Sequence, residues 1–257
     1  ALTLYGEIDL SIIQSMPGGR KETITEIIPF TSRHSLYLDI AEKVKNGHQV
    51  FIVCPLIQES ESIDVQAVEK LFTDISKNQL KGVHVAMLHG KMNSEEKDQI
   101  MSEFRDAKTK VLVSTTVIEV GVDVPRANII VIEGAERFGL AQIHQLRGRV
   151  GRGGEQGYCY LVPSQDIGET RRLRAVASTS SGFKLAELDL ELRGPGAIYG
   201  TRQSGLLDLR IARFDDRKML LRARKAAEEF IESRDDMLKY NELTKRVKHF
   251  QSLTKLN

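Results

Sequence analysis

An eight-residue segment, 145–152, combines residue types that could contact a triphosphate. It reads Gln-Leu-Arg-Gly-Arg-Val-Gly-Arg and contains three arginines, two glycines and one glutamine. Arg149 and Arg152 are three positions apart, a spacing that places two side chains on the same face of a helix. Arginine stays charged and can pair with phosphate oxygens through two N–H groups at once. We therefore expect a phosphate-facing helix start here, with Gln145 orienting a neighbour; a solvated basic helix end is the alternative.

The stretch 111–125, upstream of this segment, has a second arrangement suited to ligand binding. An apolar run, 111–113, leads into three hydroxyl residues, 114–116, and then to Gly121 and Asp123. In an open parallel sheet, ligands bind beyond the carboxyl ends of the strands. The order of residue types therefore predicts a strand whose end faces a ligand, although each residue taken singly is also typical of a capped turn.

Together the two segments resemble motifs V and VI of superfamily 2 helicases, the latter with the pattern Gln-x-x-Gly-Arg-x-x-Arg. The resemblance implies that Arg149 and Arg152 reach across a cleft to ATP held by a partner domain, and that Gln145 orders both arginines. It also implies nucleotide contacts from Glu119, Gly121 and Asp123. Backbone phosphate contacts position a protein without selecting a base sequence, and the resemblance assigns them to the hydroxyl residues Ser114, Thr115 and Thr116.

Two further strand ends resemble helicase motifs. The tripeptide Val53-Cys54-Pro55 is similar to motif IV, although an ordinary core strand has the same composition. His89 and Gly90 follow an apolar strand and precede Asn93, which with Glu96 three residues later resembles a capping box at a helix start. Similar helicases have His-Gly at this place, close to the nucleic-acid strand that they follow. The resemblance therefore predicts nucleic-acid contacts from these two residues, and a turn with a solvated Lys91 is the alternative.

The segment 183–205 is rich in glycine and also contains two arginines and a glutamine. Its glycines allow close approach of the backbone and positive φ angles. The segment resembles the TRG motif of RecG-type branched-DNA helicases and of the transcription-repair coupling factor, and Arg-Gly-Pro-Gly followed by Thr-Arg-Gln-Ser-Gly is closer to the RecG type. The resemblance implies that this motif transmits ATP-driven movement to duplex DNA through Arg193, Gly194, Gly196, Gly200, Arg202, Gln203 and Gly205.

Two motifs of a complete helicase motor are absent from the sequence. There is no Gly-x-x-x-x-Gly-Lys-Ser/Thr loop to hold the β and γ phosphates, and no Asp-Glu pair after a strand to hold Mg²⁺. In related helicases both belong to the first motor domain, which in the RecG type follows a DNA-binding wedge domain. We therefore expect ATP and Mg²⁺ as cofactors only with that first domain, no metal site here, and no measurable ATP hydrolysis by the chain alone.

The composition is that of a packed globular protein. The 257 residues are 41% hydrophobic and 28% charged, and the net charge of +2 gives no overall attraction to nucleic acid, so such binding must come from local arginine clusters. Cys54 and Cys159 lie in apolar runs and are predicted to be buried thiols, which is typical of the reducing cytoplasm. No apolar run is long enough to span a membrane, and no signal peptide is recognisable.

Short β-branched strands alternate with helical patterns along residues 23–163. Strands are expected at 23–28, 50–55, 83–88, 111–114, 128–133 and 158–162, and helices at 33–46, 65–75, 93–104 and 140–146. Strands that are apolar on both faces and alternate with helices indicate a three-layer α/β fold, a parallel sheet flanked by helices. Further helices are expected at 166–178 and 215–232.

The helicase resemblance identifies residues 1–163 as a second RecA-like motor domain of the P-loop NTPase type, and residues 164–257 as a helical hairpin, TRG loop and C-terminal helices. The implied function is the C-terminal motor half of an ATP-dependent translocase that remodels branched DNA, such as stalled forks and Holliday junctions, in recombination and repair. The implied partners are branched double-stranded DNA and the first motor and wedge domains, with no membrane. Two alternatives remain: the motor half of a transcription-repair coupling factor, and a nucleic-acid-binding module without catalysis.

Overall fold

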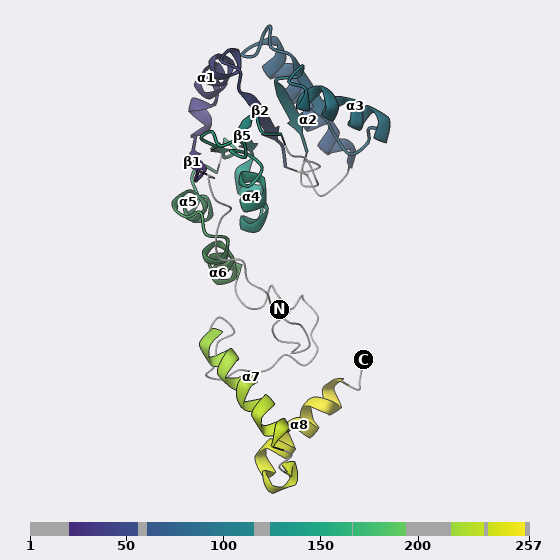
Figure 1. The fold of residues 1–257 in the computed structure, drawn as a ribbon, viewed down its shortest axis with the longest axis vertical. Coiled ribbons are helices and arrows are strands. Elements are labelled where there is room, and N and C mark those ends of the chain that lie inside the picture. The colour runs from purple at the N-terminus through teal and green to yellow at the C-terminus, as the bar shows by residue number, and fades with distance from the viewer. Residues whose placement is uncertain are drawn as a thin grey trace. The chain divides into compact units, whose positions relative to one another are not determined.

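The structure, a computed structural model, describes residues 21–55, 61–115, 124–165, 167–193, 217–233 and 236–254. The chain divides into two compact units: one spans Ser15–Asp189, and the other combines Ala1–Gln14 with Leu190–Asn257. Figure 1 shows the described elements of both units. The sheet and the predicted motif V and motif VI segments belong to the first unit.

Among the described residues, six parallel strands form a single sheet. They are β1 (Ile24–Ile27), β2 (Gln49–Val53), β3 (Val85–Leu88), β4 (Val111–Ser114), β5 (Ala127–Glu133) and β6 (Tyr158–Val162). Their order across the sheet is β1-β6-β5-β2-β4-β3, and every neighbouring pair is parallel. The predicted parallel sheet is therefore confirmed. All strands end at one side of the sheet, the carboxyl edge, and begin at the opposite side, the amino edge.

Helices cover both faces of the sheet, in the three-layer arrangement that the sequence predicts (Figure 1). The helices up to residue 193 are α1 (Arg33–Lys45), α2 (Glu61–Lys77), α3 (Ser94–Arg105), α4 (Leu140–Arg147), α5 (Arg171–Ser178) and α6 (Gly182–Arg193). The core formed with α1 and α2 includes Val50 and Ile52 of β2. Because successive strand residues point to opposite faces, the intervening Phe51 lies on the other side, where its ring centroid is 4.9 Å from that of Phe104 in α3.

Capping residues set the starts of two helices. The capping box predicted for Asn93 is confirmed: its Oδ1 accepts from the N–H of Glu96 at 2.8 Å, and the Glu96 carboxylate accepts from the N–H of Asn93 at 3.2 Å. The helix expected from residue 166 begins later, at residue 171, so that predicted boundary is wrong. The physical reason is Thr170, whose Oγ1 accepts from the N–H of Leu173 at 3.2 Å and so caps α5.

Beyond the last residues of α6, the described part of the second unit consists of two helices and a short turn between them. These are α7 (Arg217–Glu232), the 3-10 turn η6 (Met237–Lys239) and α8 (Asn241–Thr254). The helix expected at 215–232 is thus confirmed as α7. Phe230 and Tyr240 meet edge to face with ring centroids 5.3 Å apart, which ties the end of α7 to the start of α8. None of the helices that the structure describes is long and apolar enough to cross a membrane.

Both cysteines are buried free thiols, as their apolar surroundings predict. Burial raises the pKa of Cys54 to about 12, and the charge of Glu133 acts in the same direction. Burial also raises the pKa of Cys159 to about 12. Because the thiolate is the reactive form, both thiols are unreactive near neutral pH in the folded protein.

These raised pKa values should make stability fall at alkaline pH. An unfolded thiol loses its proton near about pH 8.5, whereas the folded thiols keep theirs up to about pH 12. Between these values the unfolded state binds fewer protons, so the free energy of unfolding should fall by about 1.4 kcal/mol per pH unit for each thiol. Urea unfolding between about pH 9 and 11 measures this slope. A Cys54→Ala, Cys159→Ala double variant should have a shallower slope, and an unchanged slope would contradict the prediction.

Among the described residues, Ala107 is the one non-glycine residue with a positive φ, 58°, in the turn between α3 and β4. The left-handed conformation costs an L-residue about 1–2 kcal/mol. Ala107→Gly should therefore raise the free energy of unfolding, measured with urea, by about 0.5–1 kcal/mol. The matched control is Ala175→Gly inside α5, which should lower it by up to about 1 kcal/mol. A stability loss in both variants would show that the turn is not strained.

Candidate nucleotide and nucleic-acid interface

The predicted phosphate-contacting arginines lie on a loop at the amino edge of the sheet, which we call the arginine loop (residues 148–157). Helix α4 ends just before Gly148, which is its C-cap, so Arg149 and Arg152 follow the helix. The prediction that this segment starts a helix is therefore wrong. The physical reason is Gly151, which adopts a φ of +70° and turns the chain out of the helical path.

The arginine loop packs closely against segments that precede neighbouring strands. A Cβ atom on Gly153 would lie 2.5 Å from the carbonyl oxygen of Pro125, ahead of β5, so only glycine allows this approach. Gln156 Nε2 donates to the carbonyl of Glu22, ahead of β1, at 2.6 Å. These contacts hold Gly153 and Gln156 of the loop against the amino edge of the sheet.

The side chains predicted to contact the nucleotide differ in their exposure. Arg152 is exposed, and its Nε donates to the carbonyl of Gly148 at 3.2 Å, whereas Arg149 is half-buried. Gln145, predicted to order the arginines, lies in the last turn of α4 with an exposed side chain. The other predicted nucleotide contacts lie outside the described residues: Glu119, Gly121 and Asp123.

The sequence analysis missed the role of a third arginine in this segment. Arg147 is 6% exposed and donates to the carbonyls of Val176 at 3.1 Å and Thr179 at 2.8 Å, where α5 ends. It also bonds to Nδ1 of His144 at 3.0 Å. Burial and the charge of Arg147 lower the pKa of His144, which favours a neutral ring that accepts this bond. A signal was present, because Arg147 lies four positions after the buried Ile143, on the apolar face of α4.

The helices that lead to the predicted coupling segment are attached to α4. Arg172 of α5 donates to the carbonyl of Phe138, just before α4, at 3.0 Å. At the start of α6, a Cβ atom on Gly182 would lie 2.8 Å from Nε2 of His144 in α4. Arg193 is the last residue of α6. The other predicted coupling residues lie outside the described ones: Gly194, Gly196, Gly200, Arg202, Gln203 and Gly205.

Several residues predicted to contact nucleic acid come together at the carboxyl edge. Leu88, the last residue of β3, is paired with Ser114, the last residue of β4. His89 and Thr115 come next in these two strands, and the N–H of Thr115 donates to the carbonyl of Leu88 at 3.4 Å. The predicted contacts therefore lie at the opposite edge of the sheet from the arginine loop.

Three side chains at the carboxyl edge have buried polar atoms without a hydrogen-bond partner among the described residues. Ser114 and Thr115 are 0% and 2% exposed, and their hydroxyl oxygens make no hydrogen bond within the described part of the chain. The same holds for Nδ1 of His89. Unsatisfied buried polar groups are rare in folded proteins, and ligand sites are one place where they are retained. Of the remaining predicted contacts, Gly90 is exposed and Thr116 lies outside the described residues.

A carboxylate at the end of β5 was also missed by the sequence analysis. Glu133 Oε1 accepts from Arg33 Nε at 2.8 Å and from the Tyr37 hydroxyl at 2.5 Å, which joins β5 to the start of α1. Burial and the charge of Glu133 raise the pKa of Tyr37 and keep its hydroxyl protonated. The partners are 100 and 96 positions apart in the sequence, so no local pattern could have indicated this cluster.

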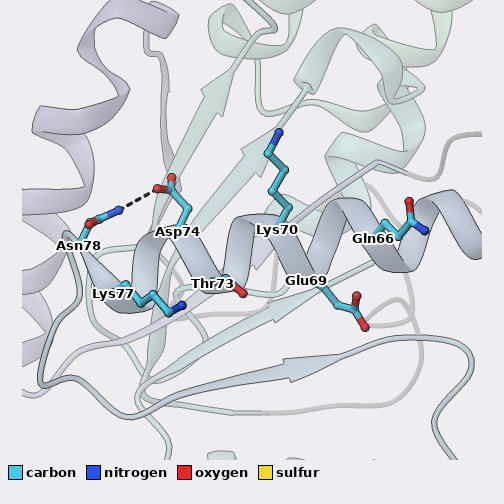
Figure 2. A pocket seen from close by; sticks show the side chains of 7 residues that line it. All are labelled: Gln66, Glu69, Lys70, Thr73, Asp74, Lys77 and Asn78. Atoms are coloured by element: carbon cyan, nitrogen blue, oxygen red, sulfur yellow. Dashed lines mark hydrogen bonds between the residues drawn. The ribbon is translucent and has the colours of Figure 1, made fainter.

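A hollow along α2 contains none of the predicted site residues. Figure 2 shows its lining side chains on this helix, with a 2.9 Å hydrogen bond from Asn78 Nδ2 to Asp74 Oδ1. Glu69 and Asp74 lie in this hollow together with Lys70 and Lys77, so its charge favours neither an anion nor a cation. In the part of the chain that the structure describes, no group of three or more His, Cys, Asp or Glu residues could hold a metal ion.

Two family models match the chain. One is the helicase conserved C-terminal domain, at residues 32–154, and the other is the C-terminal part of domain 3 of ATP-dependent DNA helicase RecG, at residues 179–257. The chain is 46% identical over 232 residues to ATP-dependent DNA helicase RecG of Thermotoga maritima, a match that covers 89% of this chain and 30% of that protein. The protein of the same name from Streptococcus pneumoniae is 46% identical over 230 residues, covering 88% of this chain and 34% of that protein.

A solved structure, that of RecG bound to a three-way DNA junction, is similar to this chain with a TM-score of 0.60 and 47% sequence identity. The match covers 72% of this chain and 24% of that one. The chain therefore spans about a third of the length of the curated relatives that it matches.

The bonds of Arg147 should make a measurable contribution to stability. Arg147→Met removes three hydrogen bonds and leaves the two carbonyls at the end of α5 without this donor. We expect the free energy of unfolding, measured with urea, to fall by about 2–3 kcal/mol. Arg174→Met is the matched control: its side chain is exposed and, among the described residues, paired with surface Glu169, so it should change stability by less than about 1 kcal/mol. Equal effects of the two substitutions would contradict a special role for Arg147.

Proposed function

Because the chain belongs to the RecG family of helicases, we propose that it is the C-terminal motor part of an ATP-dependent enzyme that moves along double-stranded DNA and remodels branched DNA. Residues 1–163 serve as the second motor domain, and residues 164–257 carry the helical hairpin, the coupling segment and the C-terminal helices. The enzyme works in recombination and repair in the cytoplasm. The match of residues 179–257 to the RecG model favours this function over that of a transcription-repair coupling factor.

The arginine loop is the feature that supports this proposal most directly. It presents two arginines, one exposed and one half-buried, on a backbone fixed to the amino edge. Arg149 and Arg152 stabilise the negative charge that spreads over the phosphoryl group as ATP is cleaved. ATP and Mg²⁺ are held by the phosphate-binding loop and acidic pair of a first motor domain, since this sequence contains neither motif. Glu119, Gly121 and Asp123 contribute further nucleotide contacts, and Gln145 orders the arginines.

The carboxyl edge serves as the nucleic-acid contact of the motor. Ser114, Thr115 and Thr116, together with His89 and Gly90, contact the sugar-phosphate backbone, which fixes position without selecting sequence. The hydroxyls of Ser114 and Thr115 have no partner among the described residues, which supports this role because phosphate oxygens accept from hydroxyl groups. The partner of this edge is branched double-stranded DNA, as in the junction complex of the related RecG.

Arg147 supports a path from ATP cleavage to DNA movement. It belongs to the helix that carries the arginine loop, and it bonds to the carbonyls at the end of α5. From there the chain continues through α6 to Arg193, where the predicted coupling segment begins. A shift of the arginine loop on loss of the γ-phosphate is passed through these bonds to Arg202, Gln203 and the glycines around them.

Reconstitution from separate parts tests this function. The chain alone should hydrolyse no ATP above background, and addition of a separately made first motor domain should produce ATP hydrolysis that branched DNA stimulates. Arg152→Ala should lower this hydrolysis by about a thousandfold or more, because an arginine finger contributes about 10³ to 10⁵ in rate. Arg105→Ala removes an exposed arginine from the end of α3 and should leave the rate unchanged. Robust hydrolysis by the chain alone, or hydrolysis insensitive to Arg152→Ala, would overturn the proposal.

A further inference from the structure

One acidic residue of the arginine loop is bound to two segments of the sheet. Glu155 Oε2 accepts a hydrogen bond from Asn128 Nδ2 at the start of β5. The same oxygen lies 3.7 Å from Nδ1 of His48, just before β2, so the pair becomes an ion pair when His48 is protonated. Glu155 therefore ties the loop to the two central strands at their amino ends.

The loop is also held by the bond from Gln156 to Glu22, but its backbone contains glycines at which the conformation can change. Gly151 and Gly154 adopt positive φ angles of 70° and 80°, and glycine moves between backbone conformations more easily than any other residue. Gly153 packs against Pro125 through backbone atoms, which sets how close the loop comes but offers no directional side-chain bond. The Glu155 carboxylate supplies such a bond three residues after Arg152.

The orientation of the Asn128 amide also depends on Glu155. Asn128 is 2% exposed, and its Oδ1 has no hydrogen-bond partner among the described residues. A rotation that exchanged the two amide atoms would bring Oδ1 against the negative carboxylate, so Glu155 determines which way the amide points. A buried unsatisfied acceptor costs free energy, and the fold retains it here beside the arginine loop.

We propose that Glu155 is a positioning residue that holds the arginine loop against Asn128 and His48, so that Arg149 and Arg152 meet the γ-phosphate of ATP in the first motor domain. This inference rests on the proposed motor function. Glu155 itself contacts neither ATP nor DNA, and the predicted DNA contacts lie at the opposite edge of the sheet. Its loss therefore affects the rate of ATP cleavage and leaves DNA binding unchanged.

The decisive measurement is the steady-state ATPase of the complete helicase that contains this chain. A misplacement of about 1 Å in a catalytic group can cost about a hundredfold in rate. In Glu155→Ala we expect kcat to fall about tenfold or more, with no change in the concentration of branched DNA that gives half-maximal stimulation. Glu155→Gln keeps an acceptor for Asn128 Nδ2 and should retain most of the rate. Glu169→Ala is the matched control, a carboxylate that pairs with Arg174 on α5, and should behave as the wild type.

Hydrogen exchange on the chain alone tests whether Glu155 holds the arginine loop in place, independently of any effect on catalysis. Backbone amides of residues 149–157 should exchange faster in Glu155→Ala than in Glu155→Gln or Glu169→Ala, while exchange in the sheet stays unchanged. If Arg152→Ala is inactive but Glu155→Ala keeps its kcat within about twofold, or if loop exchange is unaltered, the positioning role is wrong and the motor function stands. If Arg152→Ala is itself active, the motor function fails and the positioning role fails with it.

Discussion

The parallel register of the sheet is the constraint on which the rest of the structure depends. Every strand ends at the same edge, so each helix must return the chain to the opposite edge before the next strand can begin. Helix α4 performs this return between β5 and β6, and it delivers the arginine loop to the amino edge. The ends of β3 and β4 place His89 and Thr115 at the carboxyl edge. One topology thus separates the surface proposed for ATP from the surface proposed for DNA by about the length of a strand.

A buried arginine gives this separation a mechanical consequence. Arg147 lies on the apolar face of α4, and its guanidinium reaches backbone carbonyls of the segment that follows β6. Charge-assisted bonds to carbonyls are directional, whereas apolar packing tolerates small slips. In the proposed motor, a rotation of α4 is transmitted through these bonds to the junction of α5 and α6. The segment 145–152 thus contains exposed side chains and also Arg147, which bonds α4 to the end of α5.

Sequence reasoning succeeded where a local pattern carries the information. The alternation of apolar strands and helices predicted the parallel sheet, and Asn93 with Glu96 predicted the start of α3. It failed at the arginine segment, where a three-residue spacing suggested a helix and Gly151 between the arginines determined a loop. It also could not find the bond between Glu133 and Arg33, whose partners are 100 positions apart and meet only after the sheet has formed.

Placing the arginines on a loop requires that the loop be held at both ends. Ordering one flexible residue costs about 1–2 kcal/mol in conformational entropy. A loop without anchors would incur this cost each time it became ordered. Arg147 fixes the chain before the arginines and Glu155 fixes it after them, so most of this ordering is complete in the folded protein. The glycines between the two anchors still let the backbone of the loop change conformation. In the proposed motor, a loop anchored in this way responds to the γ-phosphate and passes the change to α4, which a rigid helix start could do only by moving as a whole.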